Sequence, residues 1–475
     1  MSTTLEQLGY HYSFASAVDD HGIQLAACDQ LRTSATSADK VHAGPFLRSQ
    51  LVYPRQTARM LRALSRVVRT HYFDARPPQL DPIVTTSPSV VRFEGFSGCC
   101  GVYVRLDIDR EALQTQEMRW GTTNVDFNGE MIQHLDRIGR DTNVSLDISH
   151  EGISVEHSGA QVFEKKVTLP KRWIKGLCEV QVYQTRLELV HRFSPGLLMP
   201  LLQQAGGGTA RSGAGRSRGQ LNYLLVQAGR PRLSPRMSPG AIPVGGLNRL
   251  DSLRSILPLI REVQLYSDPE SGVHAWMAES ESLRYWLVVS PELYRGFSGE
   301  GQVLSALANG AWEDRVDDLE DWLAGETTGR AGQPPKETID PAEIASALGW
   351  SVADANIALA GLATSGLAGF DLANGFYFQR RLPMNPQVVE TDQPRLRGAR
   401  KLVDENAVRR INLAASEVRD SIAMEVRSGE IAYFVRLGSE ADSCTCPWFS
   451  RHQGERGPCK HVLAARIVAQ GKHQK

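Results

Sequence analysis

The chain has 475 residues, 41% of them hydrophobic and 22% charged, a composition typical of globular proteins, and its length predicts about two to four domains. Lysine plus arginine and aspartate plus glutamate each total 53, so the formal net charge is zero and binding to a polyanion requires a local basic patch. No apolar run approaches the roughly 18 residues that span a bilayer, and the N-terminus lacks a basic segment followed by an apolar one, so we expect a cytoplasmic protein.

Residues 1–203 are expected to form an α+β domain of unknown role. Residues 60–68 carry apolar side chains at helical spacing, whereas residues 102–108 alternate as a half-buried strand does. Two polar segments bounded by glycine are expected to form tight turns or, alternatively, a site. We expect the chain not to be an enzyme. An unidentified activity would have to use the reactive residues of this domain, namely Cys99, Cys100, Asn124, Asp126 and His134.

Residues 204–250 are predicted to be a flexible basic linker or arm, because they hold many glycines and seven arginines with no acid before Asp251. The glycines do not predict a phosphate loop, since no Gly-Lys-Ser/Thr sequence follows them. Residues 251–335 are expected to be mostly helical and to end in an acidic run at 313–321. That run is interpreted as a solvated helix face, or as a surface that docks against the arginine arm.

Residues 336–390 show the pattern of a winged-helix-like domain. Asp340 is placed to cap a helix that starts with Pro341, and a second helix is predicted at 351–365. Two short strands, at 367–371 and 375–380, complete the order helix, turn, helix and hairpin. Because the second helix contains no arginine or lysine, a structural or protein-binding role is favoured over reading of DNA.

Residues 391–475 are predicted to form a helix followed by a small zinc-binding module. A β-hairpin at 422–437 leads to Cys444 and Cys446, which point to one side of an extended chain. Cys459 and His461 follow at the start of a predicted helix. Seven cysteines in a chain of this length do not make a disulfide scaffold, and three thiolates with one imidazole complete a tetrahedral shell. We therefore predict one structural Zn²⁺ with no open coordination position, and we leave the nearby His452 unassigned.

The sequences Cys-Pro-Trp-Phe and Pro-Cys-Lys-His-Val-Leu-Ala around these ligands resemble the SWIM zinc finger, over about residues 425–469. The expected fold class is thus an α+β multidomain protein with a helical middle, a winged-helix-like domain and a C-terminal SWIM finger made of a hairpin plus a helix. The layout is similar to that of bacterial SWIM proteins encoded beside MoxR-type ATPases and von Willebrand A-domain proteins. This similarity suggests such proteins as partners.

The resemblance implies a module that binds nucleic acid or other proteins. Residues 395–475 hold 15 lysines and arginines against 9 aspartates and glutamates, which favours contact with phosphates. The candidate nucleic-acid contacts are Arg451, Arg456, Lys460 and Arg466. The alternative is a protein-interaction adaptor of an ATPase-associated complex that makes no contact with nucleic acid.

Overall fold

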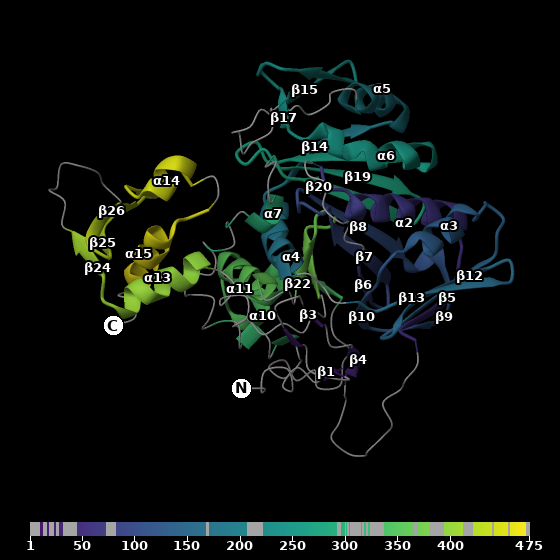
Figure 1. Cartoon of the computed structure of the whole chain (residues 1–475), viewed down its shortest axis with the longest axis horizontal. Coiled ribbons are helices and arrows are strands. Elements are labelled where there is room, and N and C mark those ends of the chain that lie inside the picture. Colours follow the sequence, from purple (N-terminus) through teal and green to yellow (C-terminus); the bar gives the residue numbers. More distant parts are fainter. Residues whose placement is uncertain are drawn as a thin grey trace, which may run out of the picture. The chain divides into compact units, whose positions relative to one another are not determined.

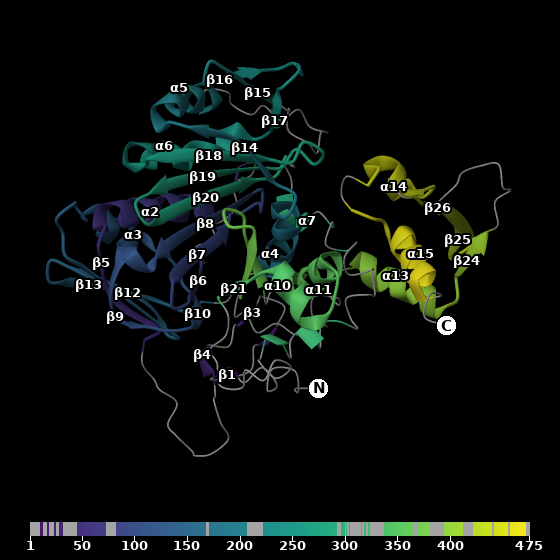
Figure 2. The same ribbon diagram turned by 180° about the vertical axis from the view of Figure 1, so that it is seen from behind.

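The computed structural model divides the chain into two units. It describes residues 45–72, 82–167, 171–206, 222–291, 337–364, 368–379, 394–411, 421–438, 441–454 and 457–471, with short pieces at 10–12, 17–18, 23–24, 28–31, 296–299, 301, 304, 315, 318–319 and 322–323. The first unit comprises Met1–Ser298, Leu372–Gly375 and Gln379–Pro383, and the second comprises Gly299–Asp371, Phe376–Phe378 and Met384–Lys475. Figures 1 and 2 show the elements from two sides.

The first unit is built on an eight-stranded antiparallel sheet with the strand order β10-β6-β7-β8-β20-β19-β18-β14. Its centre is the pairing of β8 with β20, in which Val102 lies opposite Val289 and Leu106 opposite Tyr285. The strands are β6 (Ile83–Thr86), β7 (Val90–Phe96), β8 (Val102–Asp109), β10 (Gly121–Asn124), β14 (Glu188–Phe193), β18 (Glu262–Ser267), β19 (His274–Ser280) and β20 (Leu283–Val289).

Four smaller sheets also belong to the described part of this unit, two of them formed by pairs of short strands near the N-terminus. The five-stranded sheet has the order β13-β12-β11-β5-β9, and the three-stranded sheet has the order β16-β15-β17. Their strands are β5 (Leu47–Leu51), β9 (Leu113–Met118), β11 (Val144–Ser149), β12 (Gly152–His157), β13 (Ala160–Lys165), β15 (Asn222–Gln227), β16 (Arg230–Ser234) and β17 (Ile242–Val244). Short strands at the N-terminal end are β1 (Tyr10–Tyr12), β2 (Ala17–Val18), β3 (Ile23–Gln24) and β4 (Cys28–Leu31).

Helix α2 (Pro54–Arg69) packs against the large sheet because one of its faces is apolar along its whole length, including the buried Leu61, Leu64 and Val68. Gly95 of β7 permits this close approach. A Cβ atom at that position would lie 2.7 Å from Cγ2 of Val68 and 3.2 Å from the Trp173 ring. The other helices of the unit are α3 (Gly129–Asp136), α4 (Lys171–Gln184), α5 (Pro195–Gly206), α6 (Asp251–Ile256) and α7 (Gly296–Gly299), with 3₁₀ turns η1 (Arg110–Ala112), η2 (Leu247–Leu250) and η3 (Leu257–Leu259).

Mixed α/β content is confirmed, but two segments have a secondary structure that differs from the one expected. Residues 222–250, expected within a linker, form the three-stranded sheet and η2. The hairpin arises because Ala228 and Gly229, with φ values of 50° and 75°, form a two-residue turn between β15 and β16. The described residues of the region 251–335 are also not mostly helical, since they include β18, β19 and β20. Residues 207–221 and most of the acidic run at 313–321 lie outside the described residues.

The expected domain boundary at 203 is therefore misplaced, because the large sheet takes strands from both sides of it. Strand β20 is almost entirely apolar and is buried on both faces, so its sequence shows no alternation. The sequence of such a strand has no alternation of apolar and polar residues. Its pairing with β8, which joins the regions before and after residue 203, was therefore not predicted.

The two helices and two strands expected for residues 336–390 are present in the expected order, and a short strand that was not expected precedes them. The elements are β21 (Thr338–Ile339), α10 (Pro341–Leu348), α11 (Val352–Thr364), β22 (Ala368–Asp371) and β23 (Phe376–Gln379), with the strand order β21-β23-β22. The Asp340 side chain accepts a hydrogen bond of 2.8 Å from the backbone N–H of Ala342, and Gly349, with φ of 68°, ends α10. The winged-helix interpretation of these elements stays a prediction.

The C-terminal part of the second unit is a four-stranded sheet, β24-β25-β26-β27, with helices on one face. In both views, α13 lies beside α15, and the two helices pack against each other (Figures 1 and 2). The elements are α13 (Pro394–Asp404), β24 (Val408–Ile411), β25 (Ile422–Ser428), β26 (Ile431–Leu437), β27 (Ser443–Cys444), α14 (Pro447–His452) and α15 (Lys460–Gly471). In the described part of the chain, no helix is both long enough and apolar enough to span a membrane.

Candidate metal centre

Cys444, Cys446, Cys459 and His461 converge at the junction of β27, α14 and α15. One ligand atom from each residue lies within 4.8 Å of all the others. The Nδ1 atom of His461 is 3.9 Å from Sγ of Cys444 and 4.0 Å from Sγ of Cys459. A tetrahedral zinc ion, with Zn–S of about 2.3 Å and Zn–N of about 2.1 Å, places its ligand atoms at nearly these separations.

Backbone amides hold the three sulfur atoms in place. Cys446 is the N-cap of α14, and its Sγ accepts a hydrogen bond of 3.3 Å from the N–H of Phe449. Sγ of Cys444 accepts one of 3.4 Å from the N–H of Cys446, and Sγ of Cys459 accepts one of 3.4 Å from the N–H of Val462. Such N–H···S bonds favour the thiolate, which is the form that binds metal.

The cluster is shielded from solvent. The exposed fractions are 7% for Cys444, 2% for Cys446 and Cys459, and 4% for His461. The ring of Tyr433 lies 4.4 Å from the His461 ring, centroid to centroid. Nε2 of His461 is buried and has no hydrogen-bond partner among the described residues, so Nδ1 is the nitrogen directed at the sulfurs.

Burial and mutual hydrogen bonds shift the pKa values of the three thiols in different directions. A hydrogen bond from the Cys444 thiol, assisted by His461, lowers the pKa of Cys459 to about 4. The same shared proton, together with burial, raises the pKa of Cys444, and burial raises the pKa of Cys446. Three thiolates do not persist together in a buried cluster without a counter-charge, which Zn²⁺ supplies by displacing the protons.

The donor set therefore fits one structural Zn²⁺. Four protein ligands complete the shell and leave no position for water or substrate. Bound there, the ion cross-links the end of the sheet to the first turns of α14 and α15, in a module whose own core is small.

The four candidate nucleic-acid contacts differ in exposure and in their partners within the module. Arg451 is exposed on α14. Lys460 donates a hydrogen bond of 2.9 Å to Oγ of Ser428, and Arg466 forms an ion pair with Asp442 in which Nε lies 2.7 Å from Oδ2. Both therefore bind partners within the module. Arg456 lies outside the described residues.

His452 is not part of the metal cluster. Its ring lies 4.7 Å from the Trp448 ring, and Trp448 in turn lies beneath the guanidinium of Arg395, at 4.7 Å. Arg395 also donates a hydrogen bond of 3.0 Å to the carbonyl oxygen of Pro458, the residue before Cys459. No local sequence pattern predicts this support, because α13 precedes the first ligand by about fifty residues.

The reactive residues considered in the first unit do not form one site. Cys99 and Cys100 are buried in the turn between β7 and β8, whereas Asn124 ends β10, with β6 between β10 and β7. Neighbouring strands lie about 4.8 Å apart, so β10 and β7 are separated by roughly 10 Å. The ring centroids of His134 and His157 lie 3.9 Å apart with the rings tilted by 30°, and burial raises the pKa of Asp126.

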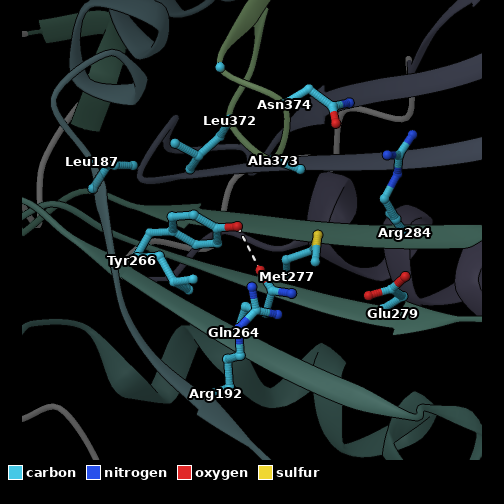
Figure 3. A pocket seen from close by; sticks show the side chains of 12 residues that line it. Leu187, Arg192, Gln264, Tyr266, Met277, Glu279, Arg284, Leu372, Ala373 and Asn374 are labelled. Carbon is cyan, nitrogen blue, oxygen red and sulfur yellow. Dashed lines mark hydrogen bonds between the residues drawn. The ribbon is translucent and has the colours of Figure 1, made fainter.

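A groove in the first unit was not foreseen from the sequence. It has a volume of about 510 Å³ and lies between strands β14, β18, β19 and β20 and the tip Leu372–Gly375 of the β22–β23 hairpin (Figure 3). The Tyr266 hydroxyl donates a hydrogen bond of 2.7 Å to Gln264 on its floor. Arg284, also on the floor, pairs with Asp109 at 2.8 Å. The residues that line it are far apart in sequence, so no local motif marks it.

Comparison with known proteins identifies the C-terminal module. Residues 433–468 match the SWIM zinc finger family. This match covers all four ligands but only a small part of the chain, and no curated protein matches the sequence.

Among solved structures, the chain is similar to the Proliferating Cellular Nuclear Antigen from Entamoeba histolytica, with 11% identity and a TM-score of 0.36. It is also similar to the PCNA2–PCNA3 complex from Sulfolobus tokodaii, with 9% identity and a TM-score of 0.39. Each alignment covers 52% of this chain and 99% of the other chain.

Proposed function

We propose that this protein binds nucleic acid through its C-terminal SWIM finger, with zinc acting as a structural cross-link. The observation that carries the proposal is the buried set of four ligand atoms, all within 4.8 Å of one another. A shell completed by protein leaves the metal no reactive position, so the activity of the module must lie on its surface.

That surface is rich in exposed arginine. Arg409, Arg427 and Arg436 lie on the sheet, and Arg451 lies on α14, all of them solvent-exposed. Arginine binds phosphate oxygens with a fixed, bidentate geometry, and nucleic-acid affinity is dominated by such contacts. A local basic surface is sufficient even though the net charge of the whole chain is zero.

The test measures binding of zinc-loaded, full-length protein to single-stranded and double-stranded DNA and RNA over a salt titration. Binding should weaken steeply as salt rises, since each neutralised phosphate releases counterions. The Cys459→Ala variant should lose most of this binding. Absence of binding at low salt, or binding that is insensitive to salt, would show that the finger has another role.

A protein-interaction adaptor is the second candidate, and the segment 337–379 is the feature that favours it. Helix α11 contains no lysine or arginine, and Val352 at its start is 50% exposed. This surface suits a protein partner better than phosphate, and a MoxR-type ATPase or a von Willebrand A-domain protein is a partner of the proposed kind. Pull-downs with the Cys459→Ala variant should then recover the same protein partners as pull-downs with the wild type. Loss of these partners in the variant would contradict the assignment of protein binding to the segment 337–379.

A further inference from the structure

We infer that the outer face of the four-stranded sheet in the finger is a platform for single-stranded nucleic acid, on which a base stacks against Phe434 between arginine side chains. This inference rests on the proposed function and names both the partner class and the contact surface. It uses side chains outside the metal cluster and outside the four candidate contacts considered above.

Strand register defines the outer face. Met424, Val426 and Val435 are buried against the helices and therefore mark the inner face. Residues that alternate with them point the other way. Across the strands, one outer row is Arg409, Glu425 and Phe434. The row on one side of it is Arg427 with Ala432, and the row on the other side is Ile411, Ala423, Arg436 and Ser443.

Phe434 is an exposed aromatic residue near the middle of this face. Its exposed fraction is 57%, although it lies in an inner strand of the sheet. Its backbone is fixed by a hydrogen bond from its N–H to Oγ1 of Thr445, at 3.0 Å, and by the return bond from the N–H of Thr445 to its carbonyl. Its outer neighbours on its own strand are Ala432 and Arg436, and those diagonally across are Ala423 and Arg427, so two small residues and two arginines surround the exposed ring.

The charge around Phe434 is positive. The side chains of Arg409 and Arg427 are 75% and 71% exposed, and Arg436 is exposed on the same strand as Phe434. The one acid in these rows, Glu425, is only 17% exposed and lies 3.6 Å from Arg409 and 3.5 Å from Arg427. Three arginines against one shielded carboxylate complement a phosphate backbone, whereas an exposed ring among them adds a stacking surface.

The shape of the outer face favours single-stranded over double-stranded nucleic acid. The major groove of a duplex is about 12 Å wide and admits a helix or a two-stranded ribbon, whereas four strands at about 4.8 Å spacing are wider than that. A ring on such a sheet reaches the face of a base only where the base is not stacked inside a duplex. Stacking on aromatic residues tolerates any base, so the platform should bind with little sequence preference.

The experiment compares Phe434→Leu with Ile431→Ala in the full-length, zinc-loaded protein. Ile431 is the matched control because it lies on the same strand, is apolar and is also 57% exposed, but belongs to the hairpin end rather than to the outer rows. Binding is measured by fluorescence anisotropy with a 20-nucleotide oligo(dT), an oligo(U) of equal length and a 20-base-pair duplex. A 2-aminopurine placed in the DNA strand reports stacking, and zinc content verifies that each variant is folded.

We expect Phe434→Leu to weaken single-strand binding about tenfold and to remove the change in 2-aminopurine fluorescence, while Ile431→Ala behaves as the wild type. Arg427→Gln should weaken binding and reduce the dependence on salt by about one phosphate contact. If Phe434→Leu binds single strands as tightly as the wild type does, the platform is overturned but the proposed function stands. The same holds if the wild type binds the duplex more tightly than single strands. No binding to any of the three by the wild type would overturn both.

Discussion

Cys459 is the ligand whose environment stabilises a thiolate most strongly. It immediately precedes α15, where the helix dipole favours negative charge, and it receives hydrogen bonds from the Val462 N–H and from its neighbours in the cluster. Its surroundings therefore favour the thiolate, the form that binds zinc.

The Cys459→Ala variant should lose its zinc. We expect about one zinc per chain in the wild type and a small fraction of that in the variant, because two thiols and an imidazole do not close a tetrahedral shell. The measurement is metal analysis after dialysis against a weak chelator. Cys178→Ala, which removes a buried cysteine of α4 far from the ligands in sequence, is the control and should retain full zinc. Equal zinc in both variants would contradict the assignment.

His274 predicts a pH dependence in the first unit. It is fully buried, its Nε2 donates to the Gly245 carbonyl at 2.7 Å, and its Nδ1 accepts from Trp276 at 2.9 Å. Burial, with a contribution from Arg249, lowers its pKa from 6.5 to about 4. Between these values the unfolded chain binds a proton that the folded chain does not, so stability falls as the pH falls.

Between pH 7.5 and pH 5 the contribution of His274 should lower the free energy of unfolding of the first unit by about 2 kcal/mol, whereas Asp109 and Glu164, whose pKa values burial raises to about 6 and about 7, contribute with the opposite sign. The measurement is urea denaturation followed through the buried tryptophans Trp173, Trp276 and Trp286. The His274→Gln variant lacks the His274 contribution, so its stability at pH 5 relative to pH 7.5 should be higher than that of the wild type by about 2 kcal/mol. An unchanged pH dependence in this variant would show that other groups are responsible.

At the scale of single residues, the sequence was sufficient to predict the metal ligands but not to predict which arginines are free to contact a partner at the surface. Cys-x-Cys followed by Cys-x-His is a local spacing, and local geometry brings each pair together. Arg466 was expected to contact nucleic acid, yet it forms an ion pair with Asp442. Asp442 lies 24 positions earlier in the sequence, before the first metal ligand. A side chain's partner across a fold is not encoded in periodicity, so exposed and paired arginines look alike in the sequence.

Helix α13 is the element that ties the region before the finger to the metal site. Leu396, Ala399 and Leu402 are buried along one face, and Arg395 reaches both the Trp448 ring and the Pro458 carbonyl. The last contact fixes the backbone that leads into Cys459. The helix therefore supports the second ligand pair from outside the segment that matches the SWIM family.

Removing this support should loosen the zinc site without abolishing it. For Arg395→Ala we expect the finger to lose about 2 kcal/mol of stability, the sum of a partly buried cation–π contact and a charged hydrogen bond. Zinc release to a chromogenic chelator should be correspondingly faster. Lys401→Ala is the control on the same helix, because its ion pair with Glu405 is exposed and should contribute little. Identical release rates for the two variants would mean that α13 does not support the site.

Elements with strong local signals were predicted best. Asp340 and Pro341 start α10 as expected, and Gly349 ends it, since a cap, a proline and a left-handed glycine each act within a few residues. By contrast, β15 and β16 were hidden in a segment rich in glycine and arginine, where composition outweighed the short apolar alternation at 222–226.

At the scale of the molecule, the large sheet was beyond what the sequence shows. Strand β8 alternates and was recognised, but its neighbour β20 comes from residues 283–289, in a region interpreted as helical. Pairing between strands so distant in sequence depends on the complete fold, and a strand buried on both faces resembles a buried helix in composition. The boundary expected at residue 203 therefore cut through a sheet.

Because all four ligands belong to the second unit, removal of zinc should affect the two units differently. Zinc stabilises only the state that binds it, so a strong chelator should lower the melting temperature of the finger. The first unit has its own large core, including three fully buried tryptophans, and should melt at an unchanged temperature. Calorimetry with and without chelator, together with near-ultraviolet circular dichroism, separates the two transitions. If both transitions shifted together, the zinc site would also stabilise the eight-stranded sheet, and the finger would have to be regarded as part of a single cooperative fold.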